Sequence, residues 1–157
     1  MTDKTLTIKY HEYASTAELP EADRQLLQAA VEAADGAYAP YSSFHVGAAV
    51  RLDDGTIVRG SNQENIAYPS GLCAERTALF AAAAQHPQAA GFEAIAIVGR
   101  NREGRLCAAS PCGACRQVMS EYEQRQGHSM RVLCLMDGGA VRVVGSAADL
   151  LPLAFEM

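Results

Sequence analysis

The segment from Phe44 to Asn62 reads FHVGAAVRLDDGTIVRGSN. Its two apolar runs, 44–52 and 56–62, are joined by Asp53-Asp54-Gly55. An Asp-Gly pair between two apolar runs is a strong hairpin signal, because glycine readily adopts the positive φ that tight hairpin turns require. The segment therefore predicts two antiparallel strands that belong to a sheet.

Helical patterns flank this hairpin. Apolar residues recur at helical spacing over 21–35, and Gly36 follows as a helix terminator. The alanine-rich segment 73–85 stops before Pro87 and predicts a helix that can lie close to a sheet. A third helix is expected over 112–124.

Four further segments predict strands. The apolar run 93–98 is typical of a buried central strand, and 130–136 and 141–144 are separated by Asp137-Gly138-Gly139-Ala140, which favours a second hairpin. Residues 5–10 alternate between polar and apolar and predict a half-buried strand.

The order of these elements predicts the fold class. Helices between strands imply parallel crossovers, whereas the two tight turns imply antiparallel pairs. We expect an α/β fold with three layers (α/β/α), a mixed five-stranded sheet and an extra N-terminal strand. Residues 1–20 are interpreted as an N-terminal extension and residues 21–157 as a single domain.

Composition limits the class of partner. The 157 residues contain 13 Lys plus Arg against 18 Asp plus Glu, a net charge of -5. Nucleic-acid binders normally carry a basic excess, so a small-molecule ligand is favoured. No apolar run approaches the roughly 18 residues of a membrane span, and the polar N-terminus has no signal-peptide core. We therefore expect a cytoplasmic protein that binds neither nucleic acid nor membrane.

The cysteines point to a metal site. There are five, and an odd number without a secretion signal argues against a disulfide framework. Cys112 and Cys115 lie three apart at one helix start, hence on one face, and Cys73 begins another helix. The Cys-x-x-Cys spacing alone also fits structural zinc and redox pairs. Three protein ligands with no fourth at a comparable helix start favour catalytic Zn²⁺, because one position is left for water.

Two residues beside Cys73 could serve that chemistry. Glu75 can take a proton from water at the metal and pass it to a substrate nitrogen, which makes it the candidate catalytic residue. Three thiolates and Zn²⁺ total one negative charge, which weakens the metal as a Lewis acid. Two helix N-termini and hydrogen bonds from Arg76 to a thiolate could offset that charge.

The pair of motifs Cys73-Ala74-Glu75 and Pro111-Cys112-x-x-Cys115 resembles the zinc-dependent nucleoside deaminases. More of the chain is similar to the small homotetrameric cytidine deaminases, in the same order and spacing. The similar stretches are Tyr41-Ser-Ser-Phe44-x-Val46-Gly-Ala-Ala49, Asn62-x-Glu64-Asn65, Tyr68-Pro69, Cys73 to Ala78, Ser110 to Val118 and Leu150-Leu151-Pro152-x-x-Phe155.

The resemblance implies a hydrolase of pyrimidine salvage that converts cytidine or deoxycytidine to uridine or deoxyuridine with release of ammonia. It implies that Phe44 stacks on the pyrimidine and that Asn62 and Glu64 bind ribose hydroxyls, positions that one strand would place on the same face. It further implies that Ala74 and Ser110 offer backbone groups to the base edge. Tyr68 and Phe155 match positions that complete the sites of neighbouring subunits in a homotetramer.

Two departures and three alternatives accompany this interpretation. His45 stands where many family members have proline, and residues 1–20 precede the usual family start. The nearest alternative is a deaminase of another amine-bearing heterocycle such as blasticidin S, which the Asn62-x-Glu64 segment disfavours. An enzyme that edits tRNA or single-stranded DNA would need a basic groove. A non-catalytic zinc module would have no need of Glu75.

Overall fold

The computed structural model describes residues 1–89 and 91–155 of the chain. The α-helices are α1 (Glu21–Ala33), α2 (Ala74–Gln85) and α3 (Gly113–Gln126). The strands are β1 (Tyr10–Tyr13), β2 (His45–Leu52), β3 (Ile57–Ser61), β4 (Phe92–Arg100), β5 (Leu106–Cys107), β6 (Arg131–Leu135) and β7 (Val141–Val144). Short 3₁₀ turns occupy Thr16–Glu18, Ala34–Gly36, Tyr68–Ser70, Asp137–Gly139 and Ala148–Leu150.

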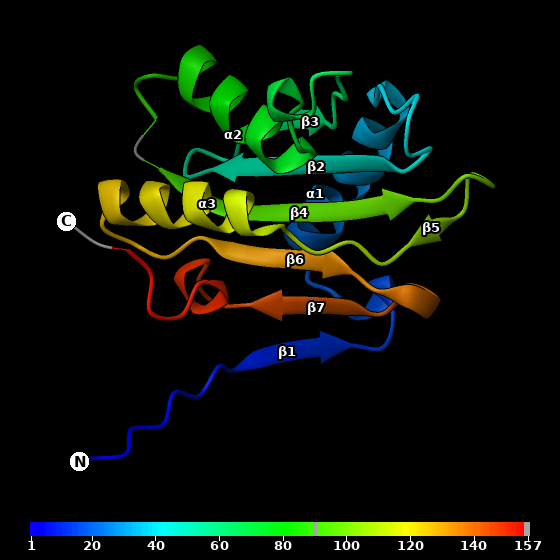
Figure 1. Ribbon diagram of the computed structural model, residues 1–157. Helices are drawn as coiled ribbons and strands as arrows, with labels where there is room; N and C mark the ends of the chain where they lie inside the picture. The colour runs from blue at the N-terminus through cyan, green and yellow to red at the C-terminus, as the bar shows by residue number, and fades with distance from the viewer. Residues whose placement is uncertain (90, 156–157) are drawn as a thin grey trace.

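The strands form one mixed sheet in the order β1-β7-β6-β4-β2-β3, with β5 paired to β4 (Figure 1). β4 and β6 are parallel, and the other five strand pairs among the described residues are antiparallel. The mixed sheet with an added N-terminal strand is confirmed. The short strand β5 is an addition that the sequence analysis did not anticipate.

The N-terminal strand was predicted over residues 5–10, and this placement is wrong. The strand is β1, and it pairs with β7 only from Tyr10, opposite Val144, to Tyr13, opposite Val141. Because β7 ends at Val144, the ladder stops at Tyr10, and residues 5–9 lie outside the strand pairing found among the described residues. Alternation of side chains indicates that a segment can be a strand, but the partner strand decides where pairing starts.

Helices cover both faces of the sheet, which confirms the three-layer prediction (Figure 1). On one face α1 buries Leu26, Leu27 and Ala30 against Ala96 and Leu133 of the central strands. On the other face α2 and α3 pack over a second cluster whose larger fully buried members include Leu79, Ile95, Ile97, Met119 and Val132. Within the described residues, no helix combines the length and the apolar character needed to cross a membrane.

The position of α2 is fixed by a backbone-to-backbone contact. A Cβ atom at Gly60 of β3 would overlap the Ala78 nitrogen and lie 2.8 Å from the Ala74 carbonyl oxygen. The helix therefore rests directly on the strand, as its alanine content predicted. This contact sets the place of the first turn of α2, which carries Cys73 and Glu75.

A buried ionic network ties α1 to the sheet. The Asp23 carboxylate accepts from Arg51 at 3.1 Å and from Arg131 at 2.7 Å, and Arg51 also donates to Glu93 at 2.8 Å. Asp23 and Arg51 are 3% and 6% exposed. Burial alone would raise the pKa of Asp23, but the hydrogen bonds from Arg131 and Arg51 hold it below its usual 3.8.

We expect Asp23→Asn to lower the free energy of unfolding by about 3 kcal/mol at pH 7, because Arg51 and Arg131 would then share a single carboxylate, that of Glu93. The pKa of Asp23 is lower in the folded chain than in the unfolded chain. Its stabilisation is therefore present above the unfolded pKa and is lost as the pH falls through the folded value. Urea unfolding from pH 7 to pH 2.5 should show the two proteins converging in acid, and the exposed Asp3→Asn variant should match wild type throughout.

Candidate active site

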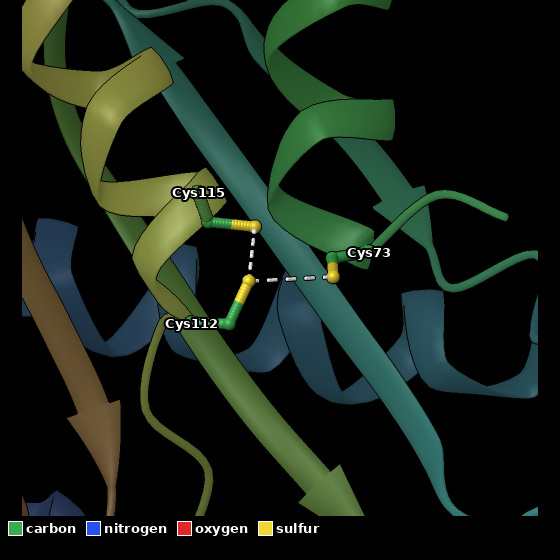
Figure 2. A group of neighbouring side chains, drawn as sticks. All are labelled: Cys73, Cys112 and Cys115. Carbon is green, nitrogen blue, oxygen red and sulfur yellow. Dashed lines mark hydrogen bonds between the residues drawn. The ribbon is translucent and has the colours of Figure 1, made fainter. Parts of the chain in front are cut away.

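Three thiols meet where α2 and α3 begin (Figure 2). Cys73 and Cys112 are the residues that precede the first turns of α2 and α3, and Cys115 lies in the first turn of α3. The Sγ atom of Cys112 lies 3.7 Å from that of Cys73 and 3.6 Å from that of Cys115. All three sulfurs lie within 4.8 Å of one another. The structure thus brings together the three cysteines singled out in the sequence.

This donor set fits Zn²⁺. Ligands at about 2.3 Å in a tetrahedron place sulfur atoms about 3.8 Å apart, which matches the observed spacing. Cys115 is buried and Cys112 is exposed toward a pocket, so the cluster is closed on one side and open on the other. Three sulfur donors at this spacing suit a tetrahedral metal ion whose fourth coordination position is accessible from the pocket.

Arg76 lies against the cluster. Its Nη2 atom donates to the Cys73 sulfur at 3.9 Å, and its Nε atom is buried with no hydrogen-bond partner in the described part of the chain. A hydrogen bond from the Cys115 thiol, together with the one from Arg76, lowers the pKa of Cys73 to about 5. The same interaction and burial raise the pKa of Cys115.

Glu75 is buried beside the thiols and lines the pocket. Glu75 as a residue is 3% exposed, and this burial, assisted by the Cys73 thiolate, raises the pKa of its carboxyl group to about 7. A carboxyl group with a pKa near neutrality can both accept and return a proton under ordinary conditions. This is the property expected of a general acid–base residue.

The pocket has a volume of about 720 Å³ and opens over the cysteine cluster. Its walls come from the start of β2, the loop between β3 and α2, the first turn of α2 and the loop before α3. It gathers most of the residues that the sequence analysis selected, namely Phe44, Asn62, Glu64, Tyr68, Cys73, Ala74, Glu75, Arg76, Ser110 and Cys112. Tyr41, Ser42 and Asn65 also line it, and their only signal in the sequence was their place inside the quoted motifs.

Asn62 and Glu64 were expected on one strand face, and this placement is wrong. β3 ends at Ser61. Gln63 instead exchanges backbone hydrogen bonds with Leu72, and the Glu64 N–H donates to the Tyr38 carbonyl at 2.8 Å. Asn62, whose N–H still donates to the Val46 carbonyl of β2 at 3.1 Å, and Glu64 therefore lie in the loop after β3, and both line the pocket.

The side chains of these two residues hold the rim of the pocket together. Asn62 accepts from the Val46 N–H at 2.7 Å and donates to the Phe44 carbonyl at 2.9 Å. Glu64 accepts from the Tyr41 N–H at 2.8 Å and from the Ser42 hydroxyl. These hydrogen bonds lower the pKa of Glu64.

The position of the Phe44 ring depends on the absence of a side chain at Gly99. A Cβ atom at Gly99 of β4 would lie 2.8 Å from Cζ of the Phe44 ring, so the ring rests where any larger residue would collide with it. The ring edge thus packs on the sheet while the residue lines the pocket.

The family model described as the cytidine and deoxycytidylate deaminase zinc-binding region matches residues 20–128. The chain belongs to this family. The matched segment contains all three cysteines, Glu75 and every other residue of the pocket named above.

Relatives and solved structures agree with this membership. A cytidine deaminase of Halalkalibacterium halodurans is 48% identical over 100 residues, which cover 63% of this chain and 71% of that protein. A cytidine deaminase of Mycobacterium tuberculosis is 42% identical over 106 residues, 66% of this chain and 74% of its own. The crystal structure of cytidine deaminase from Burkholderia pseudomallei has a TM-score of 0.72 at 46% identity and covers 83% of this chain and 97% of its own.

Two of the selected residues do not line the pocket: Cys115, which is buried in the cysteine cluster, and Phe155. Arg116 of α3 donates to the Leu150 carbonyl at 3.0 Å, which ties the start of the C-terminal segment to the cysteine-bearing helix. Phe155 projects from that segment with 75% of its surface exposed. Tyr68, by contrast, lines the pocket and is 78% exposed.

Proposed function

We propose that the protein is a zinc-dependent hydrolase that converts cytidine or deoxycytidine to uridine or deoxyuridine and releases ammonia. The observation that carries this proposal is the buried Glu75 carboxyl group beside three clustered thiols at the base of an open pocket. Membership of the deaminase family and the similarity to proteins named cytidine deaminase support the choice of substrate.

Cys73, Cys112 and Cys115 would hold the metal. Zn²⁺ bound there supplies Lewis acidity that makes water nucleophilic near neutral pH. Arg76 and the N-termini of α2 and α3 offset the negative charge of three thiolates.

Glu75 moves the protons of the reaction. In its ionised form it takes a proton from the attacking water and delivers it to N3 of cytosine as the oxygen adds to C4. It then transfers the second water proton to the amine, the C4–N4 bond breaks, and ammonia leaves. Water and cytidine are thereby converted to uridine and ammonia, with Glu75 returned to its starting form.

The remaining pocket residues are proposed to orient the nucleoside. Phe44 stacks on the pyrimidine, and backbone groups of Ala74 and Ser110 face the base edge. Asn62 and Glu64 bind ribose hydroxyls. A carboxylate has about four acceptor sites, and the contacts of Glu64 with Tyr41 and Ser42 use three of them. One site therefore remains for a hydroxyl donor.

We also propose that the enzyme is a cytoplasmic homotetramer that serves pyrimidine salvage. Tyr68 and Phe155 are large aromatic residues with most of their surface exposed, as expected for positions that complete a neighbouring subunit's site. The net charge of -5 supports a nucleoside rather than a nucleic acid as substrate.

The test is to incubate the zinc-loaded protein with cytidine, deoxycytidine and blasticidin S and to follow ultraviolet absorbance and ammonia. Loss of the cytosine absorption with one ammonia per nucleoside is the expected result. Turnover of blasticidin S alone would overturn the proposed substrate and retain the reaction. Absence of turnover for every amine by a protein with one zinc per chain would favour a binding module.

We expect Arg76→Gln to reduce zinc affinity or turnover by about 10–100-fold, because it removes the hydrogen bond and positive charge beside Cys73. Arg76→Lys keeps the charge and should recover part of the loss, which a merely structural role would not predict. The matched control is Arg102→Gln, an exposed residue of the turn after β4. Metal titration and steady-state kinetics are the measurements, and unchanged values for Arg76→Gln would contradict this role.

A further inference from the structure

The N-terminal segment continues the line of β1 beyond the edge of the sheet (Figure 1). β1 is the terminal strand of the sheet, so one of its edges has no paired strand among residues 1–89 and 91–155. Its other edge is paired with β7 only as far as Tyr10, because β7 ends at Val144. The segment precedes residues 20–128, which the family model matches, and none of its residues has a role in the proposed reaction.

One face of this segment is apolar and exposed. Tyr10 and Glu12 lie on the same face of β1, because Arg142 stacks on the Tyr10 ring at 4.9 Å and pairs with Glu12 at 3.0 Å. Side chains alternate along extended chain, so Lys4, Leu6 and Ile8 share that face when the strand is continued. Leu6 and Tyr10 are 59% and 53% exposed, and Ile8 is 39% exposed.

We propose that residues 4–12 of two copies of the chain pair as antiparallel strands about a two-fold axis at Ile8, joining two sheets edge to edge. In this register Ile8 faces Ile8 of the second copy, and Leu6 faces Tyr10. Lys4 faces Glu12, so the Glu12 carboxylate, which Arg142 already contacts, gains a second positive partner. An unpaired strand edge is a ready template for another strand.

The sequence selects this register over its neighbours. A shift by one residue places Ile8 opposite Lys9, and a shift by two places Leu6 opposite Glu12. The shift by one loses both the apolar pairs and the charge pair, whereas the shift by two keeps Ile8 opposite Tyr10 but loses the other apolar pairs and separates Lys4 from Glu12. A second copy is the occupant that fits, because the segment is complementary to itself in charge as well as in apolar pattern.

The first test is cross-linking of the zinc-loaded protein carrying Ile8→Cys, with Leu6→Cys as the matched control on the same face. At the axis the two Cβ atoms would lie about 5 Å apart, within reach of a disulfide. The two copies of residue 6 would be offset by four residues, about 13 Å, which no disulfide spans.

Under mild oxidation, Ile8→Cys should give a disulfide-linked dimer on a non-reducing denaturing gel at least about tenfold faster than Leu6→Cys. Equal rates, or no dimer from either variant, would overturn the proposal. Leu6 and Ile8 both lie outside the core, so neither substitution should disturb folding. The amount of cross-linked dimer therefore reports the pairing of the two strands. Cytidine turnover does not enter this readout, and failure here is separate from failure of the proposed reaction.

The second test concerns the charge pair. Lys4→Glu, added to Ile8→Cys, places a carboxylate opposite Glu12 and should slow cross-linking by about threefold. Lys9→Glu makes the same change in net charge but lies opposite Thr7, and it should slow cross-linking less. Equal slowing by both substitutions would show that net charge, and not this register, governs the encounter.

Discussion

Glu75→Gln is expected to lower kcat for cytidine by about 10⁴-fold, at the upper end of what general acid–base catalysis contributes. The amide has nearly the shape of the carboxyl group but can neither take up nor deliver the protons of the reaction. Because the three thiols are untouched, bound zinc should remain at one ion per chain. Metal analysis and an absorbance assay on the same preparation measure both quantities.

The fold should tolerate this change. Burial raises the pKa of Glu75 to about 7, so in the metal-free chain the ionised form is disfavoured relative to the unfolded state. A group with a raised folded pKa contributes most below its unfolded pKa and loses that contribution as the pH rises through the folded value. The Glu75→Gln variant, which carries a neutral amide at this position, should therefore have a melting temperature at pH 7 no lower than that of wild type.

A matched control separates chemistry from charge. Glu121→Gln removes the same charge from the exposed surface of α3 and should leave kcat unchanged. Turnover within tenfold of wild type in Glu75→Gln would remove Glu75 from the mechanism. Loss of zinc from this variant would mean that the carboxyl group supports the metal site instead.

Cys112→Ala is expected to abolish both zinc binding and turnover. Cys112 lies between the other two thiols, at 3.7 and 3.6 Å, and its loss leaves two donors for a metal that needs three. Because Cys112 is the exposed member of the cluster, the substitution removes little packing. Zinc analysis, circular dichroism and the absorbance assay should show a folded protein with neither metal nor activity.

Cys107→Ala is the control for this variant. Cys107 is a half-buried thiol on β5 and is not a member of the three-cysteine cluster. The Cys107→Ala variant should keep the full zinc content and the full turnover of wild type. If Cys112→Ala retained one zinc per chain and wild-type turnover, the cluster would not be the metal site. If Cys107→Ala lost zinc as well, a general effect of thiol removal would be indicated.

The sequence by itself determined the local elements and the chemistry of the donors. The hairpin around Asp53-Asp54-Gly55 and the three helices follow from patterns that need only neighbouring residues, and their observed bounds differ by few residues from those expected. The cysteines at two helix starts could be assigned to one site because a helix terminus fixes the direction of the residues that begin it.

Tertiary structure alone decided what depends on distant segments. β1 begins at Tyr10 because β7 ends at Val144, more than 130 residues later. Asn62 and Glu64 lie in a loop because Gln63 pairs with Leu72 rather than continuing along β2.

The properties of the site depend on the same long-range contacts. The raised pKa of Glu75 depends on burial under elements from the whole chain. The position of Phe44 depends on Gly99 of β4. Periodicity and turn chemistry specify which conformation a segment favours, whereas pairing, burial and close approach are properties of two segments together.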